Sequence, residues 1–238
     1  MSKGKILVLK TGGTFPELAA VAGDFEDWIA AGLAAAPGRL LVRRPPFGEA
    51  LPDPSGVAGV VVTGSHAMVT DREGWSGRTA AWVLDALAAG VPLLGICYGH
   101  QLLALAAGGR AGDNPEGREF GTAEVRLHRG AEGDPLFRGL PPVFGAHVCH
   151  AQSVTALPPG AVLLASSARD PHQAFRLGER AWGVQFHPEF SADAARFYVR
   201  ECAEELRAEG QDPGALEAGV RDTLEAAELL RRFGELIG

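Results

Sequence analysis

The stretch G-I-C-Y-G-H-Q-L-L-A-L-A-A-G-G, from Gly95 to Gly109, joins two kinds of apolar pattern through a single cysteine. The run from Val91 to Ile96 is typical of a buried strand, and the residues from Gln101 to Ala107 have helical spacing. Glycines on both sides of Cys97 permit a tight turn between the two elements. The stretch therefore predicts a strand, a sharp turn that carries Cys97, and a helix.

Similar apolar runs alternate with helical patterns before this stretch. Strands are expected at Lys5 to Lys10, Arg39 to Arg43 and Val57 to Thr63, and a helix at Thr70 to Ala89 whose T-x-x-E start resembles a capping box. Parallel strands need crossover connections, which are usually helices. The alternation therefore predicts an α/β protein with a mostly parallel twisted sheet flanked by helices.

The second half of the chain has a different pattern. Residues from Thr122 to Phe186 form short β-like pieces between Pro and Gly turns, which predicts a smaller β-rich section of the same domain. Two helices are expected after it, at Ala192 to Glu209 and Ala215 to Phe233. An apolar stripe on the second consists of Leu216, Val220, Leu224, Ala227 and Leu230. We expect residues 1–200 to form one domain and residues 201–238 to pack on it as a helical extension, with a homodimer contact as the alternative.

Composition excludes several classes of protein. The 238 residues are 46% apolar, carry a net charge of -7 and contain no Lys/Arg cluster, which argues against nucleic-acid binding. No apolar run approaches the roughly 20 residues of a membrane span, and the first apolar run reads as a strand rather than as a signal peptide. The three cysteines are widely spaced without C-x-x-C pairs, as in a reducing compartment. We expect a cytoplasmic protein that binds no membrane.

The pattern around Cys97 indicates a nucleophile. A strand that ends at G-x-C-x-G and turns directly into a helix is a nucleophile elbow with Cys in place of Ser. The helix N-terminus favours the thiolate, and the backbone N–H of Tyr98 points at the oxyanion that forms after attack. A buried core cysteine is the alternative interpretation.

A base for this nucleophile is predicted in W-G-V-Q-F-H-P-E-F, from Trp182 to Phe190. Residues two apart in an extended chain project to the same side, so His187 and Glu189 can both face the cysteine. His187 would take and return the proton, while Glu189 would orient the ring and stabilise its charge. The other histidines have no comparable partner spacing. The sequence therefore predicts a Cys97–His187–Glu189 triad.

These two motifs, in this order, resemble those of the class I glutamine amidotransferases. The segment G-R-E-F-G, from Gly117 to Gly121, is similar to the glutaminase domain of the GMP synthases in particular. The resemblance implies a flavodoxin-like class I glutaminase fold. It also implies that Cys97 attacks the side-chain amide of glutamine, that ammonia leaves with a proton from His187, and that water hydrolyses the thioester.

The resemblance also implies an oxyanion hole. Its second donor comes from a loop after an earlier strand, which here reads Thr63-Gly64-Ser65-His66. The N–H of Ser65 is the donor by position, beside Gly64 and opposite the N–H of Tyr98. Ser65 stands where relatives usually have a second glycine, so the loop has less backbone freedom. We therefore expect weak activity from the chain alone, with a partner completing the hole.

Substrate contacts follow from the resemblance as well. Gln101, one helical turn past the nucleophile, matches a glutamine that helps to hold the amino-acid end of the substrate, with a buried structural role as the alternative. Ala151 and Gln152 lie in a segment whose backbone lines the glutamine pocket in relatives. The nearby His147-x-Cys149-His150 resembles metal ligands, but no fourth ligand is spaced close by. No metal is expected.

The predicted function is that of a glutamine amidotransferase that supplies ammonia to a separate acceptor enzyme. The chain contains no P-loop and no dinucleotide-binding motif, so we expect no cofactor, no ATP binding, and a synthetase partner that activates the acceptor. A stand-alone γ-glutamyl hydrolase or peptidase with the same triad is the first alternative. A catalytically silent regulatory binding protein is the second.

Overall fold

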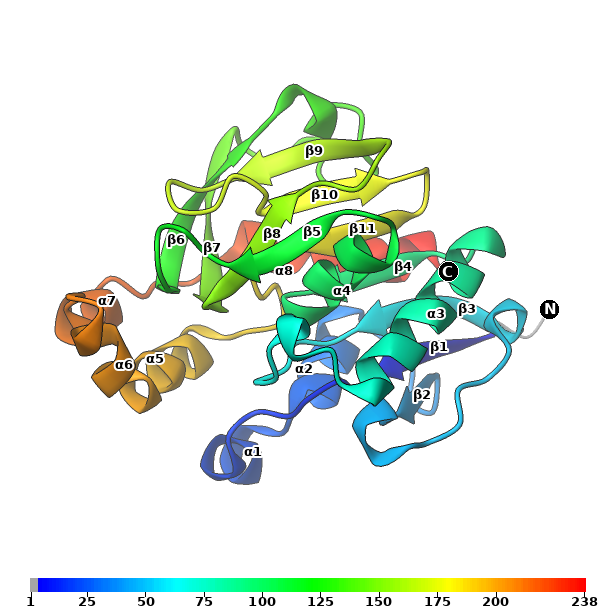
Figure 1. Ribbon diagram of the computed structural model, residues 1–238, viewed down its shortest axis with the longest axis horizontal. Helices are drawn as coiled ribbons and strands as arrows, with labels where there is room; N and C mark the ends of the chain where they lie inside the picture. The colour runs from blue at the N-terminus through cyan, green and yellow to red at the C-terminus, as the bar shows by residue number, and fades with distance from the viewer. Residues whose placement is uncertain (1–3) are drawn as a thin grey trace.

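A nine-stranded twisted sheet lies at the centre of the computed structural model, which describes residues 4–238 (Figure 1). In their order across the sheet the strands are β2 (Leu40–Arg43), β1 (Lys5–Leu9), β3 (Val57–Val62), β4 (Leu93–Ile96), β11 (Ala181–Val184), β10 (Ala174–Leu177), β9 (Ala161–Ser166), β6 (Glu119–Leu127) and β7 (Val143–His150). Neighbours from β2 to β11 pair in parallel, and those from β11 to β7 pair antiparallel. The predicted fold class is confirmed, and the β-rich section continues the same sheet.

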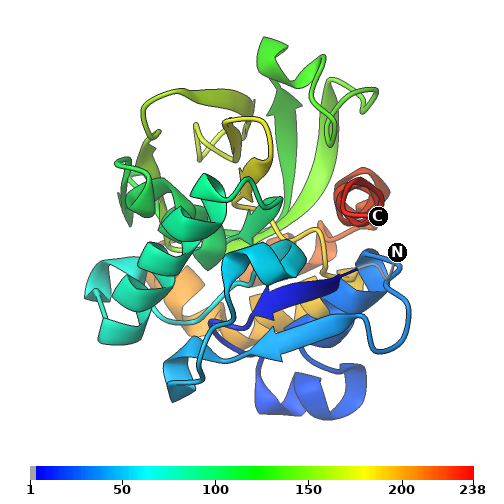
Figure 2. The same cartoon turned by 90° about the vertical axis from the view of Figure 1, so that its right-hand side faces the viewer.

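Helices cover both faces of the parallel half of the sheet. Figure 2 shows α8 (Leu224–Leu236) on one side of the sheet, with α3 (Gly74–Ala88) and α4 (Tyr98–Ala106) on the other. Successive side chains of a strand point to opposite faces, so Ile6 and Val8 of β1 join one apolar core while Leu7 and Leu9 join the other. Among residues 4–238, no helix has both the length and the apolar character that a membrane span requires.

Four short elements lie outside the sequence prediction. They are α1 (Pro16–Ala22), α2 (Phe25–Gly32), and β5 (Arg110–Asp113) with β8 (Gln152–Ala156), which pair in a small second sheet. The start of α2 has a clear cause, because the Asp24 carboxylate accepts the N–H of Phe25 and Asp27 accepts the N–H of Asp24. This reciprocal capping is the signal that could have located α2.

The predicted start of α3 is wrong. Residues Val69–Asp71 form a short 3-10 turn, η3, and the α-helix begins only at Gly74. Glu73 precedes the helix without capping it, and its carboxylate instead accepts a hydrogen bond from the indole N–H of Trp75. The T-x-x-E pattern therefore belongs to the connection before the helix.

Each of the two predicted C-terminal helices is in fact a pair of shorter helices. The observed elements are α5 (Ala192–Glu201), α6 (Ala203–Ala208), α7 (Pro213–Ala218) and α8. The break between α7 and α8 changes the helical phase, so the predicted single stripe is wrong: Leu224 is 76% exposed, whereas Leu229, Leu230 and Phe233 are buried. These three buried side chains join the core that also contains the apolar face of α2.

Helices α2 and α8 pack closely because glycines lie at their contact. A Cβ on Gly32 would lie 2.6 Å from Cδ1 of Leu230, and a Cβ on Gly234 would lie 2.4 Å from the carbonyl oxygen of Leu33. Neither space can hold a methyl group unless the helices separate. The C-terminal helix is therefore seated directly on the core of the parallel half.

We predict that Gly234→Ala lowers the free energy of unfolding by about 1–3 kcal/mol, because the new methyl group meets backbone across the helix contact. The matched control is Gly77→Ala in α3, where a Cβ has no neighbour within 4 Å. There the helix propensity of alanine should raise the stability by roughly 0.5–1 kcal/mol. Urea unfolding of both variants measures the difference, and equal shifts of the same sign would contradict this packing.

Candidate active site

Cys97 occupies the sharp turn between β4 and α4. Its backbone has φ 50° and ψ -100°, a left-handed conformation that only a few non-glycine residues adopt. A Cβ on Gly95 would lie 2.4 Å from the carbonyl oxygen of Gly99, and a Cβ on Gly99 would lie 2.4 Å from that of Val62. Both flanking glycines are thus required by space, and the turn presents the cysteine at the carboxyl end of the sheet.

The pairing of β4 with β11 brings the remaining predicted residues to Cys97. The two strands are parallel neighbours with Ile96 opposite Val184, and the N–H of Cys97 donates to the carbonyl of Val184 over 2.8 Å. The segment that leaves β11 carries His187, whose N–H donates to the carbonyl of His147 over 2.8 Å. A Cβ placed on Gly64 would lie 3.0 Å from Cε1 of His187 and 3.7 Å from Cβ of Cys97, so all three residues adjoin one another.

His187 is paired with the second predicted residue. Its Nδ1 lies 2.7 Å from Oε1 of Glu189, and both side chains are almost completely buried. Burial opposes a charge on the ring, but the Glu189 carboxylate and the nearby Cys97 side chain outweigh this effect and raise the pKa of His187 to about 10. Phe190 stacks on the ring at 4.1 Å between centroids and keeps water from that face.

The predicted backbone donors lie at two turns beside Cys97. Tyr98 is the first residue of α4, so its N–H has no acceptor within the helix. Gly64 and Ser65 follow β3, the other parallel neighbour of β4. The hydroxyl of Ser65 donates to the carbonyl of Thr11 over 3.0 Å and accepts the N–H of Ala67 over 3.1 Å. Neither Gly64 nor Ser65 has a positive φ, so the serine holds this turn through its side chain without needing the backbone freedom of glycine.

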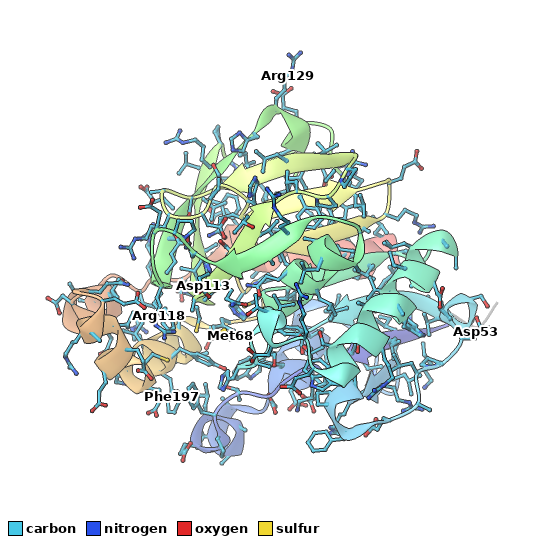
Figure 3. The ribbon with its side chains drawn as sticks, in the orientation of Figure 1. Asp53, Met68, Asp113, Arg118, Arg129 and Phe197 are labelled. Carbon is cyan, nitrogen blue, oxygen red and sulfur yellow. The ribbon has the colours of Figure 1, made fainter. Side chains whose placement is uncertain are left out.

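A pocket of about 320 Å³ opens beside Cys97. It is lined by Phe15, Ser65, His66, Ala67, Met68, Cys97, Tyr98, Gln101, Arg118, Phe120, Cys149, His150, Ala151, Gln152, Tyr198, Cys202 and Glu205. Figure 3 labels two of these residues, Met68 and Arg118, which lie between the antiparallel half of the sheet and the helices below it. All three cysteines of the chain line this one pocket, and Cys97 is the one at the elbow.

The three predicted substrate residues lie in the pocket wall. The Gln101 amide donates to the carbonyl of Gln152 over 2.7 Å and to the Gln185 side chain over 3.0 Å. The Gln152 amide donates to Thr70 and Asp113, and the carbonyl of Ala151 accepts the N–H of Asn114. The amide nitrogens of both glutamines are therefore bound to protein, and the side chains shape the wall that a substrate would meet.

The segment from Cys149 to Val154 is expected from the sequence to line the pocket through its backbone, and further side chains that the sequence pattern does not assign complete it. The carbonyl oxygen of Cys149 lies 3.8 Å from Sγ of Cys97, and an aromatic group consisting of Phe15, His66 and Tyr198 forms another part of the pocket. The Tyr198 hydroxyl donates to Thr14 over 2.9 Å. These residues come from four distant parts of the chain, so no local spacing could have grouped them.

One of the other histidines is paired with a carboxylate that is distant in the sequence. Nε2 of His150 lies 3.0 Å from Oε2 of Glu119, which is a second buried histidine–carboxylate pair. Sequence spacing missed it because the two residues face each other across β6 and β7. His147 bonds elsewhere, with Nδ1 3.2 Å from the Thr122 hydroxyl. Across residues 4–238, no three His, Cys, Asp or Glu side chains gather closely enough to hold a metal ion.

Comparison with known proteins identifies the family. Residues 46–204 match the family Glutamine amidotransferase class-I, which is more than half of the chain. The protein therefore belongs to the class I glutamine amidotransferases. Two curated relatives are the glutamine-hydrolyzing GMP synthases of Porphyromonas gingivalis, 37% identical over 145 residues, and of Thermomicrobium roseum, 34% identical over 201 residues.

The chain covers only part of these relatives. The alignments include 60% and 74% of this chain but 27% and 36% of the respective GMP synthases. Among solved structures, a glutamine amidotransferase from Thermotoga maritima superposes with a TM-score of 0.75 at 22% identity and covers 100% of this chain and 99% of its own. One from Methylobacillus flagellatus gives 0.71 at 24% identity, with 99% and 92% covered. These two likenesses establish the fold.

We predict that a diazo-ketone analogue of glutamine labels Cys97 and leaves Cys149 and Cys202 unmodified. All three thiols line the same pocket, so the analogue can reach each of them. Selective labelling of Cys97 would therefore come from its position at the elbow. Cys97→Ala should lower the turnover of glutamine by roughly 10³-fold or more. Peptide mapping after labelling is the measurement, and an adduct on either of the other cysteines would refute the assignment.

The raised pKa of His187 predicts a specific pH dependence. The folded state favours the protonated ring, so its contribution to stability is complete below about pH 6.5 and is lost as the pH rises through about 10. In Glu189→Gln the effect of burial should prevail and the pKa should fall. NMR titration of the ring tests both statements. A ring that titrates near 6.5 in both proteins would show that Glu189 does not act on it.

Proposed function

We propose that this protein hydrolyses the side-chain amide of glutamine through a thioester on Cys97 and passes the ammonia to a separate acceptor enzyme. The observation that carries the proposal is the junction of β4 and β11, where the paired His187 and Glu189 lie beside Cys97, which lines the pocket. Membership of the class I glutamine amidotransferases supports the same reaction.

The first half of the reaction forms the thioester. The N-terminus of α4 and the protonated ring of His187 favour the thiolate of Cys97, which attacks the amide carbon. The oxyanion accepts hydrogen bonds from the N–H of Tyr98 and from the Gly64–Ser65 turn, each worth about 3–4 kcal/mol of barrier. The intermediate collapses, the carbon–nitrogen bond breaks, and ammonia leaves with the proton of His187.

The second half regenerates the enzyme. His187, now neutral, takes a proton from a water molecule while the oxygen of that water attacks the thioester carbon. A second oxyanion forms at the same backbone donors, and its collapse releases glutamate and the Cys97 thiolate. Glu189 stays ionised throughout, holds the orientation of the ring and stabilises its charge whenever it is protonated.

The acceptor enzyme is proposed to be a synthetase. The curated relatives are glutamine-hydrolyzing GMP synthases, and this chain spans about a third of their length or less. A synthetase that docks near the pocket would receive the ammonia, and its docking would stimulate the release of ammonia at Cys97. We therefore propose that the chain alone is a weak glutaminase that its partner stimulates.

A second candidate is the hydrolysis of γ-glutamyl compounds. The observation that favours it is the presence of Arg118 and Glu205 in the pocket wall, where a glutamine bound at Cys97 leaves both charged side chains available to a longer substrate. The bond that breaks is again an amide at a γ-carbonyl, so the same three residues serve both reactions.

Ammonia release from glutamine by the purified chain, compared with product release from γ-glutamyl peptides, tests the choice. We expect slow, Cys97-dependent turnover of glutamine that increases when a synthetase partner is added. Rapid turnover of the peptides with glutamine ignored would instead establish the γ-glutamyl hydrolase, and His187→Ala should abolish whichever activity is found.

A further inference from the structure

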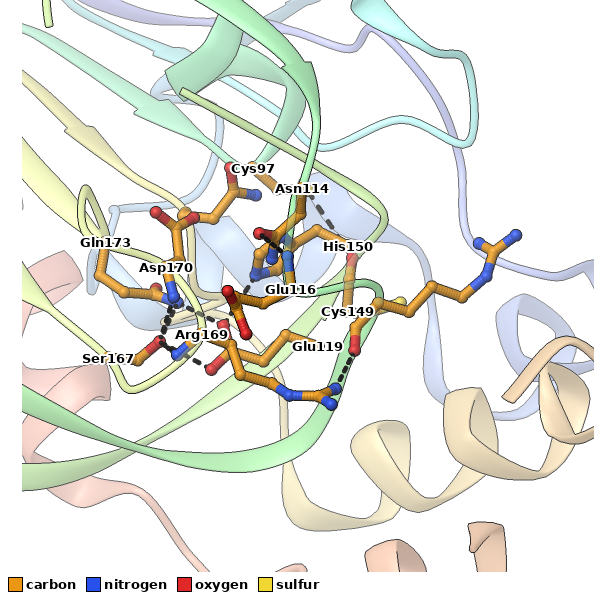
Figure 4. A network of polar contacts seen from close by, with 12 residues as sticks. Cys97, Asn114, Glu116, Glu119, Cys149, His150, Ser167, Arg169, Asp170 and Gln173 are labelled. Atoms are coloured by element: carbon orange, nitrogen blue, oxygen red, sulfur yellow. Dashed lines mark hydrogen bonds and ion pairs between the residues drawn. The ribbon is translucent and has the colours of Figure 1, made fainter. Parts of the chain in front are cut away.

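A second histidine–carboxylate pair joins the wall of the pocket, through His150, to Glu119 behind it. Glu119 and His150 face each other at the ends of β6 and β7, with side chains 7% and 1% exposed. Figure 4 shows them at the centre of a polar network that includes Ser167, Asp170 and Gln173 from the connection between β9 and β10. The proposed reaction uses none of these groups.

Hydrogen bonds hold both carboxylate oxygens of Glu119. The Ser167 hydroxyl oxygen accepts the N–H groups of Arg169 and Asp170, so its own proton goes to Oε1 of Glu119 at 2.7 Å. The Gln173 amide donates to Oε2 over 2.7 Å. Both carboxylate oxygens therefore act as acceptors, and His150 supplies the proton of the 3.0 Å bond between Nε2 and Oε2.

The other ring nitrogen of His150 must also carry a proton. Nδ1 lies 3.0 Å from the carbonyl oxygen of Gln152, which can only accept. The same oxygen accepts the Gln101 amide over 2.7 Å. His150 thus donates in two directions, to a carboxylate behind the wall and to a carbonyl of the wall itself.

The wall that His150 holds reaches the nucleophile. The carbonyl of Cys149 lies 3.8 Å from Sγ of Cys97, and Ala151 and Gln152 line the pocket. Gln101 connects this wall to the elbow, because its backbone N–H donates to the carbonyl of Cys97 over 3.1 Å. A continuous set of hydrogen bonds therefore runs from Glu119 through His150 and Gln101 to Cys97.

We propose that Glu119 and His150 are a positioning pair for the substrate: the doubly protonated ring fixes residues 149–152 and the Gln101 side chain in the geometry that receives the amino-acid end of a γ-glutamyl group. The proposal rests on the proposed function for the identity of the substrate. It assigns the pair to substrate binding and leaves acid–base chemistry to His187.

The protonation state can be tested on the unaltered protein. Two-dimensional NMR of the ring nitrogens should show His150 with protons on both Nδ1 and Nε2, a pattern that Glu119→Gln removes from Nε2. A ring that carries its proton on Nε2 alone would overturn the proposal. This readout needs no turnover, so it stands even if glutamine proves not to be the substrate.

The functional test compares Glu119→Gln and His150→Gln with the control His128→Gln. His128 also bonds through Nε2, to the Ser166 hydroxyl over 2.9 Å, but it does not line the pocket. We expect KM for glutamine to rise roughly tenfold to hundredfold in the two pair variants, with a much smaller change in kcat, and no change in the control. A loss of kcat at unchanged KM would instead make His150 a participant in the chemistry and overturn the proposal.

Two reagents separate misplaced substrate from a damaged nucleophile. The diazo-ketone analogue carries the amino-acid end of glutamine, whereas iodoacetamide needs only the thiolate of Cys97. In the pair variants, labelling of Cys97 by the analogue should slow roughly tenfold to hundredfold, and labelling by iodoacetamide should not change. Equal slowing with both reagents would show a general loss of structure and refute the positioning role. If NMR shows the His150 ring doubly protonated but the analogue fails to label the wild-type protein, only the proposed function is contradicted.

Discussion

The parallel pairing of β4 with β11 is the constraint on which the rest of the site depends. These strands are far apart in the sequence, yet Ile96 lies opposite Val184, so the turn after β4 and the segment after β11 leave the sheet side by side. The N–H of Cys97 is bonded to the last residue of β11, which ties the elbow to the segment that carries His187. A shift of this register would separate nucleophile from base and expose apolar side chains that now fill both cores.

Close packing around this junction explains why three glycines occur there. Gly95 and Gly99 each lie against backbone carbonyls, and Gly64 lies against the ring of His187. The left-handed backbone of Cys97 is held by these contacts and by the helix that starts immediately after it. A strained backbone such as the positive φ of Cys97 persists only where many surrounding contacts hold it in place, as occurs at many functional sites. Burial also strengthens the attraction between His187 and Glu189, because little water remains to screen it.

The antiparallel half of the sheet supplies the pocket wall. It places the end of β7 beside the elbow, and the N–H of His187 donates to the carbonyl of His147 on the same strand. One strand end therefore supports both His187 and the pocket wall beside Cys97. The network behind Glu119 buries several polar groups that are expensive to bury unless they are hydrogen-bonded, which gives that end of β7 a single well-defined arrangement.

By itself the sequence determined the α/β class, the elbow at Cys97 and the local pairing of His187 with Glu189, because strand period, turn glycines and a two-residue spacing are all local properties. It could not locate the break between α7 and α8. Which side chains of α8 are buried depends on the rotation of that helix about its axis where it packs against α2. Nor could the sequence join Glu119 to His150 or place the Cys149 carbonyl near Cys97. Those contacts depend on strand order and register, which only the packing of the whole sheet decides, since pairing energies between distant strands are not encoded in any one segment.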